Sequence, residues 1–183
     1  METYLRVHGQ EHPDTLESMG HLALVYLGQG RLKEAVELEV KVMETSLRVL
    51  GPQHRSSFSS IGKVTTIYST LGRWKEAEEM GVKAMEGKRR VLGQDHASTL
   101  RCMASLALTY QKQRQWKEAE ELQVKVMEAR KRVLGPEHPD TLRCMAGLAL
   151  IYWDQGRRRE AEELEVKAME IARGSLVRST RTP

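Results

Sequence analysis

Histidine is the residue of this 183-residue chain whose spacing most readily suggests chemistry. Four of its six histidines follow a glycine by three residues and recur every 42 residues: His12, His54, His96 and His138. Neutral imidazole is a common metal ligand, but zinc holds its nitrogen ligands at about 2.0–2.1 Å. Copies one repeat apart cannot converge on one ion at that distance. We therefore predict that each histidine caps a turn, and we expect no metal or other cofactor.

The two cysteines, Cys102 and Cys144, occupy equivalent positions one repeat apart. Packed neighbouring helices lie roughly 8–10 Å apart, whereas a disulfide needs Cα atoms within about 7 Å. We therefore predict two free core thiols and a reducing, cytoplasmic location. Neither cysteine has a metal-ligand partner at a recognisable spacing, and the sequence offers no evident nucleophile–base pair or carboxylate dyad. The chain is therefore predicted not to be an enzyme.

Three basic runs, residues 88–90, 130–132 and 157–159, could contact nucleic acid or acidic partners. Two of them fall in the last turns of predicted helices, where cations interact favourably with the helix dipole. No aromatic side chains accompany them as a base-stacking platform. The net charge of +4 falls to +1 without the three arginines beyond residue 172. We interpret the runs as solvated helix faces; RNA binding, which an isoelectric point near 9.1 favours, is the weaker alternative.

These residues belong to a pattern of 42 residues that occurs four times. In the first copy a helix begins at Pro13, with His12 or Asp14 as its cap. The Gln29-Gly30 pair breaks that helix, and a longer second helix covers residues 31–50. Each copy is therefore predicted to be a helix, a tight turn and a longer helix.

A fixed period in this range indicates stacked units, each too small to bury its own apolar face. The predicted fold is all-α, a right-handed α-solenoid of antiparallel helix pairs. Trp74 and Trp116 are expected in its core. The predicted organisation is a partial helix of a preceding repeat over 1–12, repeats over 13–54, 55–96, 97–138 and 139–172, and a disordered tail over 173–183 after an interruption at Gly174. Because neither end carries an atypical capping repeat, we expect a segment of a longer array, or ends that meet other protein.

The longest apolar stretch, residues 144–153, is too short to span a bilayer, so no membrane association is expected. Within the repeats, Met19, Leu22, Ala23, Tyr26 and Ala35 form a pattern that resembles the tetratricopeptide repeat. The small residues of such repeats let the two helices approach, and the tyrosine fills the space between them. The 42-residue period is similar to the repeats of kinesin light chains.

The kinesin light chain resemblance implies a non-catalytic scaffold that binds cargo peptides in a concave groove lined by first helices. Similar arrays form sensor regions of NOD-like receptor proteins, which gives an alternative function. The variable positions of the first helices are basic around an apolar strip, so we predict a protein or peptide ligand that is acidic or ends in a carboxylate and bears one large apolar anchor. The predicted peptide-binding residues are His21, Leu24, Lys63, Arg101, Ser105, Leu108, Lys112, Arg143, Leu150 and Trp153.

Overall fold

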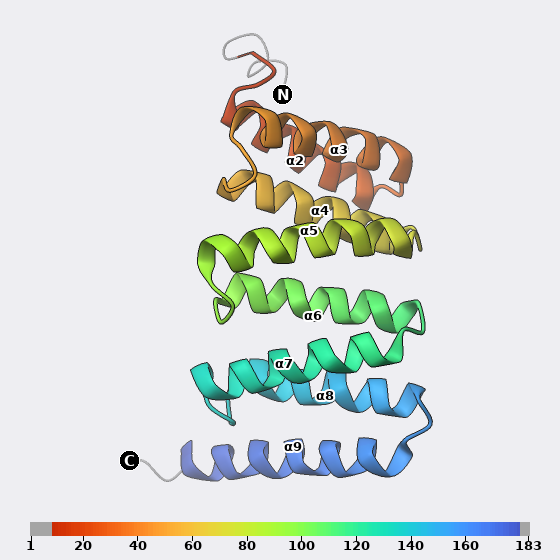
Figure 1. Ribbon diagram of the computed structural model, residues 1–183, viewed down its shortest axis with the longest axis vertical. Helices are drawn as coiled ribbons and strands as arrows, with labels where there is room; N and C mark the ends of the chain where they lie inside the picture. The colour runs from red at the N-terminus through yellow and green to blue at the C-terminus, as the bar shows by residue number, and fades with distance from the viewer. Residues whose placement is uncertain (1–8, 180–183) are drawn as a thin grey trace. The chain divides into compact units, whose positions relative to one another are not determined.

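The computed structural model describes residues 9–179, with side chains described up to residue 174 except at residue 55. These residues form helices and turns, without a strand (Figure 1). The helices are α2 (Pro13–Gly28), α3 (Leu32–Val49), α4 (Arg55–Thr70), α5 (Trp74–Leu92), α6 (Ala97–Lys112), α7 (Trp116–Leu134), α8 (Pro139–Asp154) and α9 (Arg158–Ser179).

The chain divides into two compact units, Met1–Gln94 and Asp95–Pro183. Unit 1 holds α2 to α5 and unit 2 holds α6 to α9. In unit 1, α3 packs against both α2 and α4, and α2 also contacts α4. In unit 2, α7 packs in the same way against α6 and α8. Each first helix and the second helix that follows it run antiparallel (Figure 1).

The four repeated histidines begin the first helices. Each is the N-cap of α2, α4, α6 or α8, and its Nδ1 accepts a hydrogen bond from the backbone N–H two residues later at 3.1–3.3 Å. An N-cap acceptor satisfies a backbone donor that the helix itself leaves unpaired. The predicted capping role is therefore confirmed, and for the first helix His12 is the cap.

The turn between the two helices of a repeat is stabilised by an arginine that contacts both a tyrosine ring and a glutamate. The Arg31 guanidinium lies 4.1 Å from the centre of the Tyr26 ring, and its Nε donates to Glu34 at 2.9 Å. The same cation–π contact joins Arg73 to Tyr68 and Arg157 to Tyr152. The tyrosine rings are half-buried, because each lies at the edge of the helix pair where the turn closes.

Alanine permits the close approach of the paired helices. Ala35, Ala77 and Ala119 are fully buried and Ala161 is 3% exposed. The column of Thr15, Ser57, Thr99 and Thr141 is also buried, and the hydroxyls of Ser57 and Thr141 donate to the carbonyl of the preceding turn glycine at 2.8 Å. The core of each repeat is therefore a seam of small residues flanked by larger apolar ones.

Three expectations need correction or fall outside the described residues. Trp74 and Trp116 are half-buried rather than core residues, because each begins its helix beside the exposed turn. Helix α9 continues through Gly174 to Ser179, since one glycine costs only about 1 kcal/mol inside a helix. The expected partial helix over 1–12 falls largely on residues 1–8 and the expected tail partly on 180–183, both outside the described part of the chain.

Candidate peptide-binding site

The ten predicted peptide-binding residues all lie on first helices, and they divide between the two units. His21, Leu24 and Lys63 belong to unit 1, on α2 and α4. The other seven belong to unit 2, on α6 and α8: Arg101, Ser105, Leu108, Lys112, Arg143, Leu150 and Trp153. Each unit therefore presents its own part of the predicted site.

In unit 2, four of the predicted residues come together in one pocket. Arg101, Ser105 and Leu108 from α6 face Arg143 from α8 across a cavity of about 490 Å³. Arg101 is exposed, and the side chain of Arg143 is 75% exposed while its Nη1 lies 3.1 Å from Asp140 Oδ1. Both guanidinium groups are therefore accessible to a ligand that enters the pocket.

Arg130 contributes a third guanidinium to this pocket from the second helix α7. Its Nη1 donates to the backbone carbonyl of Asp140 at 3.2 Å and lies 3.3 Å from the Sγ of Cys144. The sequence interpretation placed Arg130 on a solvated face with its neighbours in the run 130–132, and for Arg130 this is wrong. Its long side chain turns under α8, whereas Lys131 and Arg132 are exposed. A hint was present in the sequence, because the equivalent position in the first repeat holds the small, uncharged Ser46 and not a basic residue.

The apolar part of the unit 2 pocket combines a buried floor with an exposed rim. Leu100 is 3% exposed, whereas Leu108, Val133 and Leu134 are 53%, 55% and 43% exposed. Large side chains with that exposure beside a cavity are available to bury apolar surface of a ligand. The pocket thus combines cationic and apolar groups.

Cys144 is 2% exposed and its Sγ lies 3.3 Å from Arg130 Nη1; neither Cys144 nor Cys102 takes part in a disulfide. Both cysteines are thiols, as predicted, but the predicted core placement is confirmed only for Cys144, since Cys102 is half-buried. Burial raises the pKa of the Cys144 thiol, and the nearby Arg130 guanidinium only partly opposes that effect. Because the thiolate is the nucleophilic form, this thiol is a packing group rather than a reactive one.

Lys112, Leu150 and Trp153 do not line the unit 2 pocket. They lie toward the other end of the first helices, where Leu150 and Trp153 are 55% and 53% exposed. The Arg158 guanidinium lies 5.4 Å from the centre of the Trp153 ring. Leu150 and Trp153 form a separate exposed apolar surface on α8, whereas Lys112 ends α6.

Unit 1 has an equivalent pocket of about 450 Å³ with different chemistry. His21 and Lys63 line it, whereas Leu24, which is 44% exposed, does not. At the places where unit 2 has its three arginines, this pocket has one acid and two hydroxyl groups: Glu17, Ser46 and Ser59. Of the predicted basic residues, Arg101 and Arg143 therefore line the unit 2 pocket, and Lys63 lines the unit 1 pocket.

A buried carboxylate lies behind the unit 1 pocket and was not foreseen from the sequence. Glu39 on α3 is fully buried, and neither of its carboxylate oxygens accepts a hydrogen bond within the described residues. Lys63 Nζ lies 3.9 Å from Glu39 Oε1. The same nitrogen lies close over Gly20, because a Cβ at that residue would be 2.4 Å from it. Burial raises the pKa of Glu39 to about 7, although the Lys63 ammonium opposes the shift.

Tetratricopeptide repeat models match residues 15–56, 66–123 and 104–174, which together cover more than half of the sequence. The chain belongs to the tetratricopeptide repeat family. The predicted recognition and fold class are therefore confirmed.

The chain is similar in fold to several solved structures. The nearly identical TPR-like repeats of a candidate kinesin light chain from Podosopora anserina are 30% identical, with a TM-score of 0.85 over 99% of this chain and 84% of the other. BtubC (BKLC) from P. vanneervenii shares the fold at 19% identity, with a TM-score of 0.80 over 94% and 68% of the two chains. MamA from Desulfovibrio magneticus RS-1 is 18% identical, with a TM-score of 0.67 over 94% and 82%. No curated protein sequence matches the chain.

Metal-binding groups and membrane-spanning helices are absent from the described residues. Among residues 9–179, no three His, Cys, Asp or Glu side chains are grouped closely enough to hold a metal ion. In the same part of the chain, every helix is too short or too polar to cross a membrane.

Proposed function

We propose that this tetratricopeptide repeat chain is a protein-interaction scaffold, and that the pocket of unit 2 binds an acidic peptide segment with one large apolar side chain. The observation that carries the proposal is the meeting of three guanidinium groups, from Arg101, Arg130 and Arg143, at one cavity with an apolar rim. Guanidinium groups form paired, charge-assisted hydrogen bonds with carboxylates. An acidic side chain or a C-terminal carboxylate fits that arrangement.

The two acids at the pocket limit what it accepts. Asp95 is bonded to Arg132 at 2.6 Å and Asp140 lies beside Arg143, so each is partly neutralised by its own partner. Arg101 and Arg130 supply the surplus positive charge. Leu108 and Leu134 at the rim supply the apolar contact for the anchor of the ligand.

The test is binding of acidic peptides, each with one leucine or tryptophan, to the protein and to the variant Arg101→Glu plus Arg143→Glu. We expect the double substitution to weaken binding by about tenfold or more, because like charges then face the ligand. Fluorescence polarisation with labelled peptides, first selected on a peptide array, measures the change. Binding to the unmodified protein should weaken as salt is raised.

The matched control is Lys125→Glu plus Lys131→Glu. Both lysines are exposed on α7, do not line the pocket, and undergo the same change of charge. If the two double variants lose affinity equally, net charge rather than the pocket controls binding. Unchanged affinity after Arg101→Glu plus Arg143→Glu would show the assignment to be wrong.

A further inference from the structure

Helix α9 exposes a face that corresponds to a buried face of α7. On α7, Gln123 is 6% exposed and its amide donates to the carbonyl of Cys144 on α8, and Val126 is fully buried. One repeat later, on α9, Glu165 is exposed and Ala168 is only half-buried. Beside Glu165, Val166 is 48% exposed. This α9 surface therefore carries the residue pattern of a repeat junction, but it is open to solvent.

Helix α2 carries the opposite side of such a junction, also open to solvent. The position of Val25 is occupied by Ile67 on α4 and by Ile151 on α8. These two isoleucines are 1% and 2% exposed and lie on helices that pack against the second helix before them, whereas Val25 is 51% exposed. The chain thus exposes one half of a junction on α2 and the other half on α9.

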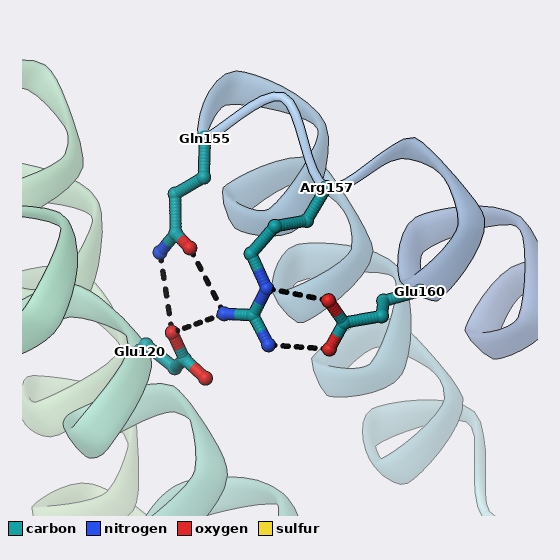
Figure 2. A network of polar contacts seen from close by, with 4 residues as sticks. All are labelled: Glu120, Gln155, Arg157 and Glu160. Carbon is teal, nitrogen blue, oxygen red and sulfur yellow. Dashed lines mark hydrogen bonds and ion pairs between the residues drawn. The ribbon is translucent and has the colours of Figure 1, made fainter.

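A polar clamp holds the junction between α7 and the α8–α9 turn (Figure 2). Glu120 Oε2 accepts hydrogen bonds from Gln155 Nε2 at 3.2 Å and from Arg157 Nη1 at 2.7 Å. Arg157 is held in place by Glu160, which accepts from its Nε at 2.7 Å, and by the Tyr152 ring. We call Glu120, Gln155, Arg157 and Glu160 the junction clamp.

Both halves of a second junction clamp are present on the two open faces. Glu162 stands on α9 one repeat after Glu120, and it is exposed. Gln29, Arg31 and Glu34 stand three repeats before Gln155, Arg157 and Glu160. Arg31 already has the required orientation, because it lies over Tyr26 and bonds Glu34, while its side chain stays 47% exposed.

We propose that two copies of this chain associate head to tail, with α9 of one copy packed on α2 of the next and Glu162 bonded to Gln29 and Arg31. Val166 then covers Val25, and Glu165 faces His21, which occupies the position of Lys63 beside Glu39. A second copy is the occupant because this chain itself supplies the complementary residues in the register of its own internal junction. This association uses other residues than the peptide pocket and goes beyond the proposed peptide binding.

The test compares self-association of the unmodified chain with that of Glu162→Arg and Arg31→Glu, by sedimentation velocity over a range of concentrations. We expect the unmodified chain to associate reversibly with a dissociation constant below about 1 mM. Each single variant places like charges at the junction and should raise the dissociation constant by about tenfold or more. An equimolar mixture of the two variants should recover association. Wherever one variant contacts the other, the junction pairs opposite charges at positions 162 and 31.

Glu128→Arg is the matched control, since Glu128 is exposed on α7 and undergoes the same change of charge. In the double variant Arg31→Glu plus Glu162→Arg, opposite charges again meet at the junction, so this variant should associate like the unmodified chain. Circular dichroism verifies that every variant is folded. A monomeric unmodified chain at about 1 mM would overturn the proposal. So would single variants that associate as well as the control, or a mixture that fails to recover association.

Discussion

The carboxylate of Glu39 lies fully buried beside Lys63, whereas Gln123, two repeats later in the same position, donates its amide to the carbonyl of Cys144 at 3.0 Å. Unit 2 thus places a neutral donor where unit 1 places an acid. The residue equivalent to Cys144 in unit 1 is Ser60, so we expect its backbone carbonyl to be the acceptor for an amide at position 39. An amide at position 39 therefore has a partner that the carboxylate lacks.

We predict that Glu39→Gln stabilises the protein at about pH 8 and has little effect at about pH 5. The folded state raises the pKa of Glu39 from 4.5 to about 7, so it favours the protonated form. The stability from this group is fully present below about pH 4.5 and is lost as the pH rises through about 7. A shift of that size corresponds to about 3 kcal/mol in the free energy of unfolding at alkaline pH. Urea unfolding followed by circular dichroism at both pH values measures it.

The reciprocal substitution Gln123→Glu is the control. It should lower the free energy of unfolding at about pH 8 and cost less at about pH 5, because it places a carboxylate in an equivalent buried position. Equal stability of Glu39→Gln and the unmodified protein at about pH 8 would contradict the buried, ionised placement of Glu39.

The α4–α5 pair differs from the other helix pairs by an exchange of volume between two facing positions. Phe58 stands on α4 where Leu16 and Leu100 stand on α2 and α6, and Gly87 stands on α5 where Ala129 stands on α7. A Cβ at Gly87 would lie 2.5 Å from the Phe58 ring. Phe58 is 5% exposed, so its ring has little room to move away. The missing side chain on α5 accommodates the larger one on α4.

We predict that Gly87→Ala destabilises the protein by up to about 2 kcal/mol, because the overpacking cost of about 1–3 kcal/mol is offset by a helix-propensity benefit of about 1 kcal/mol. In a Phe58→Leu background the same substitution should stabilise by about 1 kcal/mol, since the clash is gone and the propensity benefit is left. A double-mutant cycle from urea unfolding measures the coupling. If Gly87→Ala stabilised both backgrounds equally, the two residues would not be in steric conflict.

The limits of individual helices were largely predictable, because they depend on local signals. The second helix of the first repeat was predicted over 31–50 and is observed as Leu32–Val49. Histidine caps and turn glycines set such limits through backbone hydrogen bonds that extend over only a few residues. The end of α9 was not predictable in this way, since Gly174 is a weak helix breaker without a second signal.

The composition of the site was less predictable, because it depends on how far side chains reach from one helix to another. Periodicity grouped Arg101, Ser105, Leu108 and Arg143 as predicted ligand-binding residues, and these four line the unit 2 pocket. It could not show that Arg130 turns under α8 or that Glu39 is enclosed. Both residues lie on second helices, and their surroundings come from the next repeat.

The two units differ in how well their buried polar groups are satisfied. Among the described side chains, the buried polar atoms without a hydrogen-bond partner are those of Glu39 and Ser46, both in unit 1. Their equivalents in unit 2, Gln123 and Arg130, are both hydrogen-bonded. Helix α4 is also rich in Ser and Thr that bond to carbonyls four residues earlier, an arrangement that slightly destabilises helices. In repeat arrays, stability is close to a sum of local terms, so these defects act on their own unit.

We predict that the backbone amides of α4 exchange with solvent faster than those of α8, because local opening follows local stability. Hydrogen exchange followed by mass spectrometry at about pH 7 measures both helices in the same molecule. Glu39→Gln should slow exchange in α3 and α4 while leaving α8 unchanged, since it removes the main buried defect of unit 1. Protection of α4 that equals or exceeds that of α8 would show that unsatisfied buried groups do not set the order in which this array opens.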